Sequence, residues 1–259
     1  MKSSAATTER NSLVGVERAV RVLQSLADAE SINLAELARA TDLSEATVLR
    51  YLNSLTSLGF VERSEAARYR LGWEVFRLGQ RALAGHVPRQ AVRPVMEQLL
   101  AEFNETVNLA CRKADEIVVV EVLEGTRALK KVTDVGQSDP WHASSLGKAL
   151  LATMEDEEWK RLLERVGMPR FTSNTILTIA KMAVELKETK SRGYAIDREE
   201  FDEGLTCVGA VVPTPPGMAQ FVLSVSFLSH RLQPGALDKA GARIAEATAE
   251  ISRRLDQRA

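Results

Sequence analysis

Apolar residues recur at helical spacing through the first part of the chain, and polar capping residues divide this pattern into three helices. The first helix is expected from about Gly15 to Asp28, with its apolar residues on one face. Asn33, with Glu36 three positions later, can form a capping box for a short second helix, and Ser44 can cap a third. The apolar side of the third helix predicts a buried stripe of Val48, Leu49, Leu52 and Leu55.

The polar side of the third helix carries groups that can donate to, accept from or stack on base edges in a major groove: Ser44, Glu45, Thr47, Arg50, Tyr51 and Ser54. Two short extended segments, 60–63 and 69–71, follow Gly59. Arg63, Arg68 and Arg70 in this hairpin can contact phosphates. The order of these elements predicts a winged helix-turn-helix that binds double-stranded DNA.

The charge of this region limits how it can bind DNA. Residues 1–72 hold nine Lys and Arg and nine Asp and Glu, so the basic excess of an electrostatic binder is missing. Binding therefore depends on the arrangement of the charges. Glu45 stabilises the positive N-terminal end of the helix dipole but repels a nearby phosphate. It therefore either accepts a hydrogen bond from a cytosine amino group or faces away from the DNA.

The rest of the chain alternates between helical and strand-like patterns. A connecting helix is expected over 73–84, and a second helical stretch runs to about Phe103, with Pro94 in its first turn. Strands are expected over 106–112, 117–123, 128–132, 194–198, 207–212 and 221–227. Helices are expected within 141–152 and over 156–166, 179–192 and 237–255. This pattern indicates an α+β domain with an antiparallel sheet.

Composition excludes several classes of protein. The chain has 259 residues, 45% of them hydrophobic, and a net charge of -1, which suits two modest domains and argues against a membrane-surface role. The two cysteines, Cys111 and Cys207, have no neighbouring ligand motif, so we expect neither a metal site nor a disulfide. No cofactor motif is present. No signal peptide is evident in the polar residues 1–12, and we expect a disordered tail in a cytoplasmic protein.

Three motifs, in this order and spacing, resemble the IclR (isocitrate lyase regulator) family of bacterial transcription factors. They are the winged motif GFVER with YRLG, the segment HASSLGKALLA, and GYAIDREEFDEGLTCVGAVV. The resemblance covers residues 12 to 255. It implies an N-terminal winged helix-turn-helix (13–72), a linker helix (73–90) and an effector-binding domain (91–259) with a GAF-like or profilin-like antiparallel sheet and flanking helices. It also implies homodimers that often pair into tetramers.

The resemblance also implies a ligand pocket. The backbone amides of Ser145 and Leu146 match positions that hold an anionic group, as helix N-termini do in general. The side chains that match the pocket are Asp197, Leu205, Cys207, Ser224 and Ser226. Ser145 stands where glycine is frequent, and Trp141 precedes the histidine, so a bulkier, more polar rim is expected. The ligand can therefore be either a two-carbon oxoacid or a larger hydroxylated or aromatic acid; the sequence leaves both open.

Two other functions remain open from the sequence. Cys207, His142 and Asp197 could in principle form an activated thiolate of a hydrolase or isomerase, although no nucleophile elbow or oxyanion loop accompanies them. A regulator with a vestigial pocket is the other alternative. The sequence favours a non-enzymatic, ligand-responsive repressor or activator that binds a pseudo-palindromic operator, senses a small organic acid and controls a catabolic operon.

Overall fold

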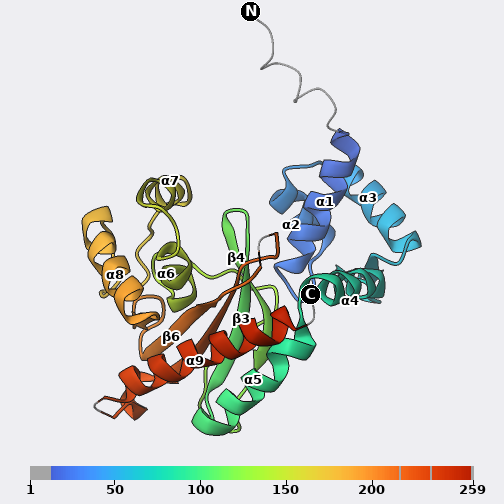
Figure 1. Cartoon of the computed structure of the whole chain (residues 1–259). Helices are drawn as coiled ribbons and strands as arrows, with labels where there is room; N and C mark the ends of the chain where they lie inside the picture. The colour runs from blue at the N-terminus through green and yellow to red at the C-terminus, as the bar shows by residue number, and fades with distance from the viewer. Residues whose placement is uncertain (1–12, 216, 234, 258–259) are drawn as a thin grey trace, which may run out of the picture. The chain divides into compact units, whose positions relative to one another are not determined.

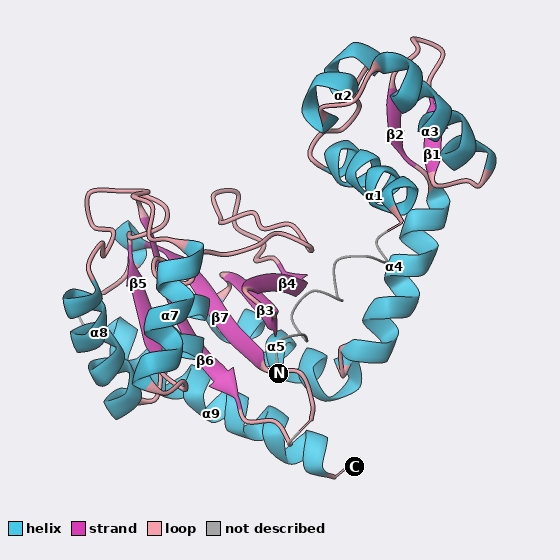
Figure 2. Cartoon of the chain, turned by 90° about the horizontal axis from the view of Figure 1, so that it is seen from above, coloured by secondary structure: helices cyan, strands magenta, loops and turns pink. Residues whose placement is uncertain are grey.

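The computed structural model describes residues 13–215, 217–233 and 235–257, so the predicted tail 1–12 lies outside the described residues. The chain forms two compact units that divide between Gly85 and His86. Figure 1 shows the elements of both units in chain order, and Figure 2 shows them by type.

The first unit is a three-helix domain with a two-stranded wing, as the sequence predicts. Its helices are α1 (Val14–Ala27), α2 (Leu34–Thr41) and α3 (Glu45–Ser57), and its strands are β1 (Val61–Arg63) and β2 (Tyr69–Leu71). Both predicted caps are present. Asn33 and Glu36 form the capping box of α2, and the Ser44 hydroxyl accepts the Thr47 amide at the start of α3. Ile32 pairs with Tyr69 and extends the wing by one bridge.

The core of the first unit is formed by one face of each helix and by the inner side of the wing. Val22, Leu37, Val48 and Leu52 are fully buried in it. Leu49, predicted to share this stripe, is instead 37% exposed. The prediction was wrong because Leu49 lies one residue from Val48, which turns it about 100° around the helix and away from the core axis.

Helix α4 (Trp73–His86) follows the wing, and α5 (Arg89–Phe103) opens the second unit. Pro94 lies inside α5, six residues along, rather than in its first turn. The helix begins earlier than predicted because the buried residues Ala91 and Val92 continue the apolar period N-terminal to the proline. A proline at this depth removes one backbone hydrogen bond from the second turn.

The second unit is built on a five-stranded antiparallel sheet in the order β4-β3-β7-β6-β5. The strands are β3 (Thr106–Lys113), β4 (Glu116–Leu123), β5 (Ala195–Arg198), β6 (Leu205–Val212) and β7 (Phe221–Leu228). Helices α5 and α9 (Ala236–Asp256) cover one face. Helices α6 (Ser145–Leu151), α7 (Asp156–Val166) and α8 (Ile179–Arg192) lie over the other (Figures 1 and 2). Strand β7 is in the middle of the sheet, and its residues from Phe221 to Phe227 are buried.

The predicted strand over 128–132 does not form. The segment is a loop whose carbonyl groups bond to side chains: Thr106 Oγ1 donates to Lys131 O at 2.5 Å, and Arg231 donates to Leu129 O at 2.9 Å. The outer edge of β4 is covered instead by residues 136–139, through Val119 N to Gln137 O at 2.9 Å. With that edge occupied and its own carbonyl groups bonded to side chains, the segment has no neighbouring strand to join. Among the described helices, none is long and apolar enough to cross a bilayer.

Candidate DNA-binding face and effector cavity

Helix α3 presents an exposed polar face that is centred on Arg50. Glu45, Arg50 and Ser54 are exposed, and Thr47 is half-buried. Asn53, which the sequence analysis did not select, is exposed on the same side because it lies three residues after Arg50. An asparagine can bond an adenine edge in two places, and an arginine can do the same to guanine.

Two residues predicted on this face have other roles in the domain. Ser44 caps α3, and its hydroxyl also lies 2.9 Å from Thr47 Oγ1. Tyr51 is half-buried and packs against the core, with its hydroxyl facing Gly15. Arg50 stacks beside the Tyr51 ring, 6.0 Å from its centroid, so the tyrosine supports the arginine from the side.

The three wing arginines differ in how far their charge is available. Arg68 donates to Ser31, from Nε to Oγ at 2.9 Å and from Nη2 to the carbonyl at 2.5 Å, so it ties the wing to the segment before α2. Arg70 forms a two-point ion pair with Glu62 on the neighbouring strand. Arg63 stacks 5.7 Å from the Tyr69 ring, and no ion pair to it is found among the described residues. Of the three wing arginines, Arg63 therefore has the positive charge that is most available to a phosphate.

In the second unit, strand register gathers polar side chains on the sheet face below α6. Asp197 of β5 is opposite Cys207 of β6, and Cys207 is opposite Ser226 of β7. In the adjoining row, Ser224 of β7 is opposite Asn108 of β3. Because alternate residues of a strand face the same side, these five side chains line one cavity.

Two glycines let α6 approach this sheet closely. A Cβ at Gly209, in the middle of β6, would lie 3.2 Å from the backbone of Ser145. A Cβ at Gly147 would collide with the backbone of Trp141. The helix start is therefore seated on the sheet, with Ser144 as its cap and with Ser144 and Ser145 in the cavity wall. No hydrogen bond to the amides of Ser145 or Leu146 is found in the described part of the chain.

Two loops close the cavity, and we call residues 124–138 and 199–204 the lid. Lys131 of the first segment pairs with Asp202 of the second at 2.5 Å, and its ammonium lies 5.8 Å from the Phe201 ring. Thr133 and Gln137 add further polar groups. The enclosed volume is about 20 Å³, which is room for about one water molecule.

Burial changes the acidity of two cavity carboxyls. It raises the pKa of Asp197 to about 7, although the amide of Glu200 donates to Asp197 at 2.7 Å and opposes the shift. Burial likewise raises the pKa of Asp139 to about 6, partly offset by the charge of Lys131. Near neutral pH the carboxyl of Asp197 is therefore more protonated than an ordinary aspartate.

Five of the eight predicted ligand-binding residues line the cavity, and three do not. The five are Ser145, Asp197, Cys207, Ser224 and Ser226. Contrary to the prediction, Trp141 is buried in the core beside α6, and its indole N–H donates to Asp115 O at 2.7 Å. Leu146 packs in that core, so only its amide can serve the site, and Leu205 lies outside the lining.

The sequence analysis missed most of the lid. Asn108 could have been found, because it is a polar residue in the middle of an apolar strand. Lys131, Thr133 and Asp139 could not, since they reach the cavity through a loop with no periodic pattern, and part of that loop was predicted as a strand. The other residues that the prediction did not include are Val119, Gln137, Ser144, Phe201 and Asp202.

The geometry does not support a nucleophilic cysteine. Burial raises the pKa of the Cys207 thiol, and the nearby charge of Asp197 raises it further, so the thiolate is disfavoured. The thiol donates to Ser226 Oγ at 3.3 Å. His142 Nε2 lies 2.8 Å from Pro169 O, and its ring packs beside Phe171, outside the cavity lining.

Comparison with known proteins agrees with both units. Residues 15–65 match the IclR helix-turn-helix domain, and residues 80–253 match the C-terminal domain of the bacterial transcriptional regulator IclR. The transcriptional regulator KdgR of Escherichia coli is 29% identical over 95% of this chain and 94% of its own. KdgR of Dickeya chrysanthemi is 31% identical over 85% of this chain and 73% of its own.

Solved structures show the same architecture. An IclR transcriptional regulator from Alicyclobacillus acidocaldarius aligns with a TM-score of 0.83 and 25% identity, covering 94% of this chain and 99% of its own. An IclR homologue from Microbacterium hydrocarbonoxydans, complexed with 4-hydroxybenzoate, aligns with a TM-score of 0.81 and 23% identity, covering 94% and 99% of the two chains. With its wing, its polar cavity and these matches, the chain belongs to the IclR family of bacterial transcriptional regulators.

Proposed function

We propose that the chain is a ligand-responsive regulator that binds a pseudo-palindromic operator and senses a small organic acid. The observation that carries this proposal is the polar cavity below α6, in the same chain as an exposed recognition helix. Lys131 and the amides of Ser145 and Leu146 are the groups offered to a carboxylate. One structural neighbour, the IclR homologue from Microbacterium hydrocarbonoxydans, is complexed with an organic acid, 4-hydroxybenzoate. Control of a catabolic operon accords with such a ligand.

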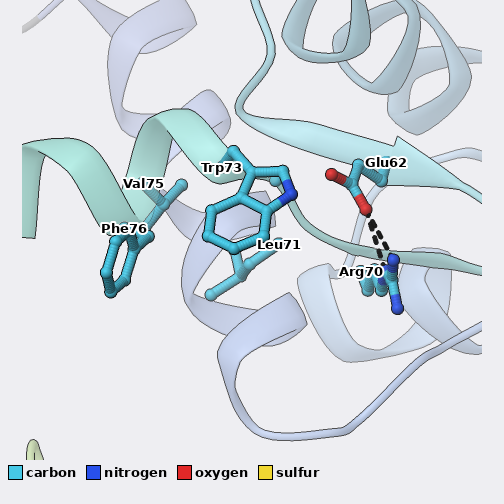
Figure 3. Close-up of a pocket in the computed structure, with 7 residues that line it drawn as sticks. Glu62, Arg70, Leu71, Trp73, Val75 and Phe76 are labelled. Atoms are coloured by element: carbon cyan, nitrogen blue, oxygen red, sulfur yellow. Dashed lines mark hydrogen bonds and ion pairs between the residues drawn. The ribbon is translucent and has the colours of Figure 1, made fainter.

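A dimer is part of this proposal. One recognition helix contacts too few base pairs for specific affinity, so a second copy is needed on two half-sites. The first unit carries an apolar surface suited to such an interface. Figure 3 shows Trp73, Val75 and Phe76 beside Leu71, next to the Glu62–Arg70 ion pair. Trp73 is 73% exposed and Phe76 56% exposed, which is unusual for a monomeric surface.

The experiment is a selection of duplexes from a randomised library with the full-length protein. Enrichment of an inverted repeat supports the proposal, and enrichment of no sequence contradicts it. The selected duplex is then titrated with protein in the presence of organic acids. An acid that changes the affinity for this duplex, but not for a scrambled one, supports the ligand-responsive part, because an effector acts only through different affinities for two states.

A further inference from the structure

Most of the residues that line the cavity carry a hydrogen-bonding group. Among the described residues that line it, only Val119, Phe201 and the thiol Cys207 lack a strong hydrogen-bonding group. Ligand pockets are usually lined mainly by apolar side chains, with a few polar groups that fix orientation. A flat aromatic acid would therefore leave many of these hydrogen-bonding groups without a partner.

Two of the lining groups have no hydrogen-bond partner among the described residues. They are Asn108 Oδ1 and Thr133 Oγ1, in side chains that are only 4% and 8% exposed. Buried polar groups in folded proteins nearly always have a partner, and an unmade bond costs free energy. Both lie in the cavity wall, from opposite sides: Asn108 from the sheet and Thr133 from the lid.

The remaining groups provide both acceptors and donors. The carboxyls of Asp139, Asp197 and Asp202 face the same cavity as Lys131. Ser226 Oγ accepts from Cys207 Sγ and from Asn108 Nδ2, each at 3.3 Å, which leaves its own hydrogen free to donate. Hydroxyl groups of a ligand can both donate to and accept from this wall, and an anionic group can pair with Lys131. The neutral form of Asp197, whose pKa burial raises to about 7, reduces repulsion of that anion.

We propose that the cavity selects a polyhydroxylated carboxylic acid of the sugar-acid class, with its hydroxyls bonded to Asn108, Thr133, Asp139 and Asp197. The carboxylate replaces Asp202 at Lys131. This rests on the proposed function, and it names the class of effector that this chain's own residues select. A site built to bond hydroxyls rejects an analogue without them far more strongly than an apolar pocket rejects an added group.

The test uses calorimetric titration of the full-length protein with matched probes. The hydroxy acids are threonate, gluconate, galactonate and glucuronate. Hexanoate has the length and charge of gluconate without its hydroxyls, sorbitol has the hydroxyls without the charge, and 4-hydroxybenzoate is the aromatic probe. We expect at least one hydroxy acid to bind at least about a hundredfold more tightly than hexanoate and sorbitol.

Variants locate the interaction. Thr133→Val keeps the shape and removes the hydroxyl, and Asn108→Leu removes the acceptor on the sheet. Each variant should weaken binding of the hydroxy acid by about tenfold. Thr248 is a buried threonine of α9 away from the cavity, so Thr248→Val should leave the affinity unchanged. Thr133 lies in a loop, so its variant keeps the test valid if the strand variant fails to fold.

The outcomes separate this inference from the proposed function. Tighter binding of hexanoate or 4-hydroxybenzoate, or equal binding of sorbitol, overturns the sugar-acid class and leaves a ligand-responsive regulator standing. Unchanged affinity in both cavity variants overturns the assigned contacts. Binding of none of the probes, by a protein that still selects its DNA repeat, overturns the inference while the DNA-binding function stands. Failure to select any DNA is a failure of the proposed function alone.

Discussion

Substitution of Asp197 by asparagine should make the second unit less dependent on pH. The carboxyl is 2% exposed, and burial raises its pKa from the ordinary value of 3.8 to about 7. The folded protein therefore binds a proton that the unfolded chain has released over this interval. The free energy of unfolding falls as pH rises from 3.8 to 7, since the folded state must give up a proton it holds more tightly.

The size of the effect follows from the interval. A shift from 3.8 to about 7 corresponds to about 4 kcal/mol at 1.4 kcal/mol per unit of pKa. In the folded protein at pH 4, Asp197 is a neutral carboxyl, and asparagine is a neutral group of the same size that can accept the Glu200 N–H. We therefore expect Asp197→Asn to leave the free energy of unfolding nearly unchanged at pH 4 and to raise it by about 4 kcal/mol at pH 8.

Urea unfolding between pH 4 and 8.5 measures this difference. The chain has three tryptophans, and Trp73 belongs to the first unit while Trp141 and Trp159 belong to the second. A Trp73→Phe background makes fluorescence report on the second unit alone, which avoids mixing two transitions. Asp256→Asn, at the exposed end of α9, controls for loss of a carboxylate. A variant whose stability runs parallel to that of the parent across the whole pH range would refute the reasoning.

Three further predictions concern the DNA-binding face, the apolar surface and the close packing of α6 at Gly147. Arg50→Ala should cost about 1 to 3 kcal/mol of DNA affinity and relax one base position per half-site, measured by anisotropy on single-base variants of the selected duplex; an equal loss on every sequence would remove its base-reading role. Phe76→Ser should shift a dimer to monomer in sedimentation equilibrium, and an unchanged mass would exclude this surface as the interface. Gly147→Ala should destabilise the second unit by about 1 to 3 kcal/mol in urea, since its Cβ meets backbone. Gly79→Ala, which meets no atom within 4 Å, should be neutral or stabilising; equal effects would contradict the close seat.

Local signals predicted most of the fold. The bounds of α7 and α8 match the predicted ranges, because each helix has an apolar period interrupted by clear ends: Gly167 after the first, and Thr178 and Gly193 around the second. The resemblance implied that Cys207 of β6 and Ser224 and Ser226 of β7 line one pocket, and the strands place all three in the cavity wall. Where local propensity and tertiary contact agree, sequence alone was sufficient.

Several side chains have environments that depend on contacts between distant segments. Arg68, which was predicted to contact phosphate, also binds Ser31, 37 residues away. Trp141 was predicted at the pocket rim, but its indole bonds to a turn between β3 and β4. The lid residues lie in a loop without a period. The side chains of Arg68 and Trp141 are long or amphipathic, so their type fits two environments, and only the packed chain selects between them.

The lid shows how a ligand in the cavity could favour one conformation. An enclosed volume of about 20 Å³ does not admit an organic acid, so entry and movement of the lid are the same event. Glu200 is fixed from below, since Lys148 pairs with its carboxylate and Thr175 donates to its carbonyl at 2.8 Å. The next two residues cover the cavity and hold Lys131, and Gly204 follows with φ of +79°. A ligand carboxylate that takes the place of Asp202 would release this short segment against a fixed anchor. The ligand would then bind the two conformations of the lid with different affinities. This difference is the condition for an effector to shift the populations of two conformations.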